Sequence, residues 1–219
     1  SSTTILCGST PLHQAARSEN VSLVEDSATG IADYWLRSWS DPTGRGGRRT
    51  ALYDKTGTEV MSFEGEQNAT LQNGLLVLQE SRLVDGGYVP ESGYGTCQVI
   101  DLATGAALPV PEGAYSCTLC GDKLVFSCYA RPEGLDDYDW DTDYRQNSWV
   151  VVQEKDGTPV YRADAASAYR LFYDSDTLSD WVELDVATGA ETTDQILYNV
   201  LTGERYTGCF FLLFSGVGA

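Results

Sequence analysis

The motif Leu52-Tyr53-Asp54-Lys55-Thr56-Gly57 decides the fold of this chain, because related versions of it recur along the sequence. Each version begins with apolar residues, continues with an Asp, Asn or Glu, and ends in Thr-Gly or Asp-Gly. A glycine after a polar residue supplies the positive φ of a tight turn, and the flanking Val, Ile, Leu and Tyr suit a half-buried strand. The motif therefore predicts β-hairpins. Its other copies lie at residues 99–105, 152–157, 184–189 and 198–203.

The spacing of the motif glycines indicates a repeated unit. Successive glycines are separated by 48, 52, 32 and 14 residues. A propeller blade is a four-stranded antiparallel meander of about 40 to 50 residues, so each of the first two intervals matches one blade. The last interval is short enough for Gly189 and Gly203 to belong to neighbouring hairpins of one unit. The chain therefore has room for four to five small blades. The five glycines are Gly57, Gly105, Gly157, Gly189 and Gly203.

Two apolar runs favour stacked sheets over a β-sandwich. Residues 75–78 read Leu-Leu-Val-Leu, and residues 149–152 read Trp-Val-Val-Val. Such runs are expected where both faces of a strand are covered, whereas a sandwich strand places polar residues on its solvent side. We predict an all-β, propeller-like array of antiparallel meanders in a single domain at residues 31–219, with a β-sandwich as the alternative. Residues 1–30 are expected either to complete a blade or to form a loosely tied lead-in.

The net charge of the chain limits the classes of partner that it can bind. Among 219 residues, 14 are Lys or Arg and 32 are Asp or Glu, which gives a formal net charge of −18. A phosphate backbone is bound through basic residues that release counterions, so this acidity argues against nucleic acid as a partner. No apolar stretch reaches the ~20 residues that cross a bilayer, so we expect no transmembrane segment in this sequence.

The cysteine content favours an exported protein. An even number of cysteines in a polar, Tyr-rich chain is compatible with disulfides. Cys117 and Cys120 have the spacing of half a zinc site, but residues three apart in a strand point to opposite faces, and His13 is the only histidine. We therefore expect no zinc there, and an extracellular or cell-surface bacterial protein whose signal or anchor has been removed. The six cysteines are Cys7, Cys97, Cys117, Cys120, Cys128 and Cys209.

The strongest candidate for a binding site is the acidic aromatic segment at residues 132–144, which holds five Asp within eight residues. Its Tyr and Trp rings beside carboxylates suit neutral sugars or peptides. In a looped conformation Asp139, Asp141 and Asp143 are a candidate Ca²⁺ site, because Ca²⁺ takes several oxygen ligands. The alternative is a solvated loop whose aromatic rings cover a core edge. The candidate ligand-binding residues are Asp137, Tyr138, Asp139, Trp140, Asp141, Asp143 and Tyr144.

A second candidate loop, at residues 85–95, is rich in glycine and carries Tyr88 and Tyr94, which we expect on a rim shared with the acidic aromatic segment. No cofactor other than Ca²⁺ is expected. No catalytic residue is assigned, because His13 is the only histidine base and no Gly-x-Ser-x-Gly motif is present. A glycosidase needs only two carboxylates, so composition leaves that activity open.

Several hairpins resemble the repeat of bacterial WG-repeat proteins. Residues 52–60, followed by residues 73–77, form an apolar-Asp-x-x-Gly hairpin before a strand that contains Gly-Leu. Residues 95–101 and 121–125 repeat this pattern, and the resemblance covers residues 49–203. It implies repeated β units, often in surface or exported proteins, with binding rather than catalytic roles.

The sequence therefore favours a non-catalytic binding or interaction module whose ligand is a glycan, a protein or a peptide. Two alternatives stay open: a carbohydrate-active hydrolase that uses carboxylates of the acidic aromatic segment, and a purely structural spacer. A carboxylate pair ~5 to 10 Å apart in a deep pocket is the geometry that a hydrolase requires.

Overall fold

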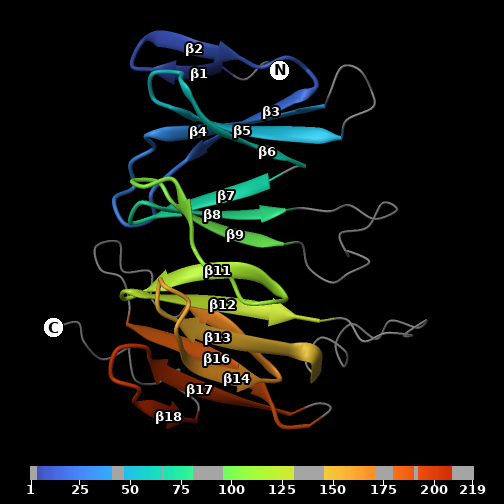
Figure 1. The fold of residues 1–219 in the computed structure, drawn as a ribbon, viewed down its shortest axis with the longest axis vertical. Coiled ribbons are helices and arrows are strands. Elements are labelled where there is room, and N and C mark those ends of the chain that lie inside the picture. Colours follow the sequence, from blue (N-terminus) through green and yellow to red (C-terminus); the bar gives the residue numbers. More distant parts are fainter. Residues whose placement is uncertain are drawn as a thin grey trace, which may run out of the picture. The chain divides into compact units, whose positions relative to one another are not determined.

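The computed structural model describes residues 4–40, 47–65, 67–80, 96–130, 146–170, 180–189 and 192–208. Strands dominate these residues and form four four-stranded antiparallel sheets and one two-stranded hairpin (Figure 1). Within each four-stranded sheet, neighbouring strands are consecutive in the chain, which is the topology of a meander. The predicted all-β fold of small antiparallel meanders is confirmed.

The strands of the four sheets follow one another along the chain without crossover connections. The N-terminal hairpin contains β1 (Thr4–Cys7) and β2 (Thr10–Gln14). The first sheet contains β3 (Glu19–Val24), β4 (Tyr34–Ser40), β5 (Arg48–Asp54) and β6 (Glu59–Glu64). The second contains β7 (Gln67–Gln72), β8 (Leu75–Glu80), β9 (Cys97–Asp101) and β10 (Ala106–Ala107). The third contains β11 (Ala114–Cys120), β12 (Lys123–Tyr129), β13 (Ser148–Gln153) and β14 (Pro159–Asp164). The fourth contains β15 (Ala166–Arg170), β16 (Trp181–Ala187), β17 (Thr193–Asn199) and β18 (Arg205–Thr207).

Four copies of the recurring motif occupy equivalent positions, since each joins the third strand of a sheet to the fourth. In the first sheet, a carboxylate oxygen of Asp54 accepts hydrogen bonds from the backbone N–H groups of Thr56 at 2.8 Å and Thr58 at 3.0 Å, and Gly57 has a φ of 84°. The acidic or amide residue thus closes the turn with its own side chain. Gly57, Gly105, Gly157 and Gly203 are separated by 48, 52 and 46 residues, so the true repeat is more regular than the five-glycine spacing suggests.

The fifth copy has a different role. It lies in the connection between β16 and β17, so Gly189 and Gly203 belong to neighbouring hairpins of the fourth sheet, as the short interval predicted. Gly189 does not have the positive φ that the motif predicts. Its turn is held instead by two bonds between Thr188 and Thr192, one of them from the backbone N–H of Thr188 to the carbonyl of Thr192 at 2.9 Å.

A first apolar core lies between the first and second sheets. Leu36 and Leu52 of the first sheet pack with Leu76 and Leu78 of the second, and each is at most 4% exposed. The whole run at residues 75–78 is buried, as a strand with both faces covered requires. Burying these side chains supplies roughly 1.5–3 kcal/mol each.

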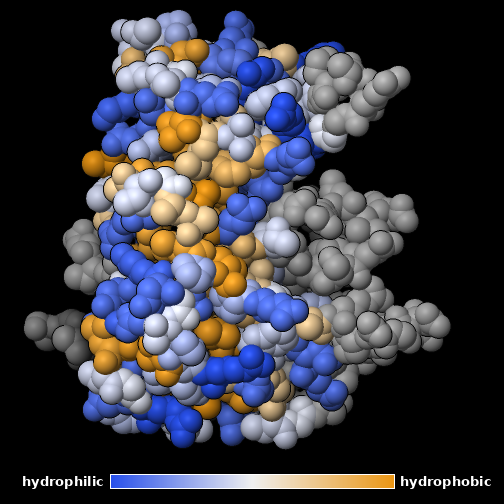
Figure 2. Space-filling view, in the orientation of Figure 1, coloured by the Kyte–Doolittle hydropathy of each residue, from blue (hydrophilic) through white to orange (hydrophobic). Residues whose placement is uncertain are grey.

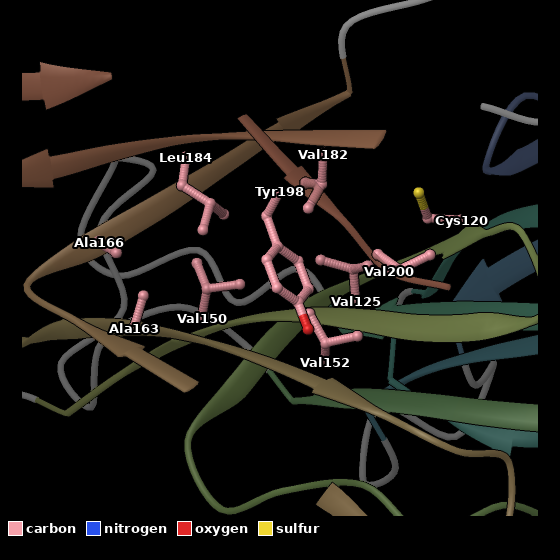
Figure 3. Packing of buried hydrophobic residues seen from close by; sticks show 10 residues of the cluster. All are labelled: Cys120, Val125, Val150, Val152, Ala163, Ala166, Val182, Leu184, Tyr198 and Val200. Carbon is pink, nitrogen blue, oxygen red and sulfur yellow. The ribbon is translucent and has the colours of Figure 1, made fainter. Parts of the chain in front are cut away.

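A second apolar core lies between the third and fourth sheets (Figure 3). The ring of Tyr198 lies among valines, with Val150 and Val152 fully buried beside it. Tyr161 of β14 stacks on Tyr198, with the ring centroids 4.2 Å apart. Small side chains at Ala163 and Ala166 complete this core, and their size leaves room for the larger Tyr and Leu side chains.

The chain divides into two compact units. One comprises Ser1–Pro90 and Gln98–Ala107, and the other Glu91–Cys97 and Leu108–Ala219, so each core belongs to one unit. Residues 19–24 of the N-terminal region form β3, the first strand of the first sheet. On the face shown in Figure 2, hydrophilic residues alternate with apolar areas. Among the described residues, no helix is long and apolar enough to cross a membrane.

Candidate functional site

The residues predicted to bind a ligand lie outside the described residues. This holds for the acidic aromatic segment, for its three candidate Ca²⁺ ligands and for both tyrosines of the second loop. The structure does describe the strands on either side of these loops, and thus the framework that carries them. The predicted residues concerned are Asp137, Tyr138, Asp139, Trp140, Asp141, Asp143, Tyr144, Tyr88 and Tyr94.

The strands that flank the acidic aromatic segment are paired with each other in the third sheet. β12 and β13 pair in register up to Tyr129 and Ser148, and beyond them the N–H of Ala130 donates to the carbonyl of Asn147 at 3.2 Å. A two-residue turn would be enough to connect two antiparallel strands at the end of their pairing. The residues between 130 and 147 are therefore a long insertion between two paired strands.

Close packing fixes the base of this insertion. The N–H of Tyr129, which is 3% exposed, donates to the carbonyl of Gly113 at 2.9 Å. Gly113 has a φ of 73°, and a Cβ added there would lie 2.8 Å from the carbonyl oxygen of Tyr129 and 2.9 Å from the Trp149 ring. Only glycine fits this position, because both the backbone conformation and the space exclude a side chain.

Long connections occur at the same topological position in three sheets. The second and third strands are joined by residues 41–47 in the first sheet, 81–96 in the second and 130–147 in the third. Because the sheets share one meander topology, these connections leave equivalent ends of their sheets. Both loops singled out in the sequence are connections of this kind.

A small cavity lies between the third and fourth sheets. It has a volume of about 40 Å³, and hydroxyl groups of Ser116, Thr118 and Ser127 line it together with Trp181. A water molecule needs roughly 10–15 Å³, so the cavity is sized for a few waters. Ligand pockets measure roughly 300–1,000 Å³, so it cannot take a sugar ring. Sequence reasoning missed this cavity, because Ser116 and Ser127 become neighbours only through strand pairing.

A charged and aromatic cluster ties the N-terminal hairpin to the first sheet. His13 Nε2 lies 2.8 Å from Glu19 Oε2, and Arg37 forms an ion pair with the other oxygen of Glu19. The hydrogen bond from Arg37 is the main cause that lowers the pKa of Glu19 to about 2, against the opposing effect of burial. His13 also stacks on Trp35, which stacks on Tyr53 at 4.4 Å between centroids. Trp35 is 4% exposed, so these rings pack the hairpin against the sheet.

Four of the five cysteines within the described ranges are buried, and Cys7 is exposed. Burial raises the pKa of Cys97 and Cys128 to about 12 and that of Cys117 well above its usual value, and only thiolates bind metal or attack substrates. Cys117 and Cys120 lie on one strand, and Cys120 alone joins the core between the third and fourth sheets. The five cysteines within the described ranges are free, so they form no disulfide there. Nor does that part of the chain contain three or more His, Cys, Asp or Glu residues placed to hold a metal ion.

Comparison with known proteins supports the fold and leaves the function open. No family model and no curated protein matches the chain. Among solved structures, it is similar to a prolyl endopeptidase, with 14% identity and a TM-score of 0.51 over 91% of this chain. It is also similar to a eukaryotic initiation factor, with 10% identity and a TM-score of 0.54 over 91% of this chain.

These similar structures contain β-propeller-type domains, so the chain has a propeller-type fold, although none of the sheets formed by the described residues is closed. The chain spans 28% of the first similar chain and 45% of the second. At 10–14% identity the similarity concerns the fold alone, since one fold serves many functions.

Proposed function

We propose that this chain is a non-catalytic interaction module that binds its ligand through the acidic aromatic segment and acts at a bacterial cell surface or outside the cell. The observation that carries this proposal is the closed ladder beneath that segment, where Ala130 and Asn147 join the two ends of a long insertion. A rigid sheet that presents a long polar and aromatic loop is a common arrangement for binding.

The chemistry of the segment selects the ligand class. Its rings offer apolar faces to a sugar or a peptide, and its carboxylates accept hydrogen bonds from hydroxyl, amide or ammonium groups. A net charge of −18 disfavours anionic ligands. The resemblance to WG-repeat proteins points in the same direction and stays a prediction.

The test is a binding screen against neutral glycans, basic and neutral peptides, and Ca²⁺, with the parent chain and the variants Trp140→Ala, Asp139→Ala and Asp141→Ala. We expect Trp140→Ala to weaken glycan or peptide binding about tenfold or more, because it removes a stacking ring. The two Asp variants should abolish any Ca²⁺ binding. Glu112→Gln is the matched control, because Glu112 is exposed and lies outside the loops.

The screen also separates the alternatives. Turnover of a glycan that is lost in an Asp variant would identify a carbohydrate-active hydrolase instead. A parent chain that retains no ligand, or variants that bind as well as the parent, would remove the binding proposal and leave the structural spacer.

A further inference from the structure

The N-terminal hairpin has the position of the outer half of a four-stranded sheet. Its turn contains Gly8, which has a φ of 59° and lies 49 residues before Gly57. The motif glycines that join third strands to fourth strands are separated by 48, 52 and 46 residues, so Gly8 continues this period. The turn lacks the acidic or amide residue of the motif, and the sequence pattern therefore did not include it. By this register β1 is a third strand and β2 a fourth strand.

The contacts of the hairpin agree with this register. A Cβ added to Gly57 would lie 3.8 Å from Cδ2 of Leu12, which is four residues after the turn glycine of the N-terminal hairpin. A Cβ added to Gly157 would lie 2.8 Å from Cβ of Pro109, which is four residues after the turn glycine between β9 and β10. In both cases the turn glycine of one sheet meets the same repeat position of the preceding hairpin. The hairpin is therefore half of a further repeat unit.

One edge of β1 has no partner strand among the described residues. In each four-stranded sheet the third strand pairs on both sides, with the second strand and with the fourth. β1 pairs with β2 alone, and no further backbone hydrogen bond joins residues 4–7 to the described part of the chain. The N–H and C=O groups along such an edge are a template for another strand. We call this the open edge of β1.

The residues of β1 do not oppose pairing with another strand. They are Thr, Ile, Leu and Cys, without a charge or a proline. Ile5 is 6% exposed and lies opposite His13, on the side that packs against the first sheet, whereas Leu6 is 55% exposed. The fourth strands differ, because β6 ends in Glu64, β14 begins with Pro159, and β10 and β18 are only two and three residues long. Charges, prolines and short length are the features that block pairing at a sheet edge.

The number of strands selects a second copy of the chain as the occupant of the open edge. Each complete sheet has four strands, and the N-terminal hairpin supplies two. A second copy supplies two more of the same kind. A twofold axis perpendicular to the sheet makes two identical edge strands run antiparallel, which is the direction of every strand pair in the four complete sheets.

We propose that two copies of this chain associate through their open edges, with β1 of one copy paired antiparallel with β1 of the other. The strand order of the shared sheet is then β2 and β1 of one copy, followed by β1 and β2 of its partner. The contact uses the backbone groups that β1 leaves unpaired and brings the exposed Leu6 of each copy beside the partner strand. It does not involve the acidic aromatic segment, so it stands or falls independently of the proposed function.

Sedimentation velocity over a concentration series tests the proposal. The parent chain should form a dimer and no larger species, because a twofold contact occupies both open edges. Salt should strengthen the dimer, since each copy carries a net charge of −18 and salt screens their repulsion. Leu6→Lys should weaken the dimer about tenfold or more, because it places a charge at the edge of each copy. The matched control is Leu23→Lys, since Leu23 is also 55% exposed but lies on β3, and it should leave the dimer unchanged.

Hydrogen exchange followed by mass spectrometry locates the contact. Peptides that cover residues 4–7 should exchange more slowly as the concentration of the parent chain is raised, while peptides that cover β6 should not change. Circular dichroism of each variant checks that the sheets are intact. A parent chain that stays monomeric overturns the proposal, and so does a dimer that Leu23→Lys weakens as much as Leu6→Lys. Protection of residues 4–7 that is independent of concentration also overturns it, because the partner strand then comes from the same copy.

Discussion

At the residue scale, single polar side chains join segments that lie apart in the sequence. Glu19 receives His13 from the N-terminal hairpin and Arg37 from β4, and it is only 10% exposed. Thr50 is fully buried and shares a hydrogen bond of 2.8 Å with Ser38. Burying a polar group costs free energy unless the group is hydrogen-bonded or ion-paired. Removing one partner is therefore expected to lower the free energy of unfolding.

Glu19→Gln should destabilise the chain at neutral pH by about 1–3 kcal/mol, because Arg37 is left without its carboxylate. The pKa of Glu19 is lowered from 4.5 to about 2, so its stabilising effect is complete above pH 4.5 and is lost as the pH falls toward 2. The difference in free energy of unfolding between parent and variant should therefore narrow over that range. Urea denaturation at several pH values measures it.

The exposed Glu112 provides the control for this pH series, since Glu112→Gln should show no such narrowing. If the difference between the parent chain and Glu19→Gln stays constant down to about pH 2, the ion pair is not the source of the stability.

At the element scale, the hairpins were predicted well because the residues that determine each turn are close together in the sequence. Asp54 and Asn199 each bond backbone N–H groups two to four residues further on, and the following glycine takes the positive φ. Both features depend on residues within one turn, so a sequence motif can report them. Gly189 shows the limit, because Thr188 and Thr192 close that turn without a positive φ.

Asn199→Ala should weaken the hairpin between β17 and β18. Asn199 is 7% exposed, and its side-chain oxygen accepts from the N–H groups of Leu201 at 3.0 Å and Thr202 at 2.9 Å. Losing these bonds should cost about 1–2 kcal/mol in the free energy of unfolding, measured in urea. Asn199→Asp keeps the accepting oxygen and is expected to lose clearly less. Equal losses in the two variants would contradict the role of the turn bond.

At the scale of the whole molecule, the described residues include two apolar cores in different parts of the chain. Leu52 lies in the core between the first and second sheets, and Leu184 in the core between the third and fourth. Both side chains have no exposed surface. The sequence predicted repeated meanders in a single domain at residues 31–219, which stays a prediction. Within the chain, two compact units can be distinguished.

Leu52→Ala and Leu184→Ala test whether these units open separately. Each variant should lose roughly 2–5 kcal/mol, because it leaves a cavity in a close-packed core. Hydrogen exchange followed by mass spectrometry should show faster exchange in the first two sheets for Leu52→Ala and in the last two for Leu184→Ala. Equally faster exchange in all four sheets for both variants would show that the chain opens as one cooperative unit.

The sequence alone determined that this chain folds into β-hairpins with a repeat near 50 residues, because turn residues and apolar runs each occupy a short segment of the sequence. Tertiary structure decided which faces of the strands became cores. It buried Cys117, stacked His13 on Trp35 and placed Glu183 beside Asp185 without a cation among the described residues. These outcomes depend on strands that lie far apart in the sequence, and burial and charge pairing act through space.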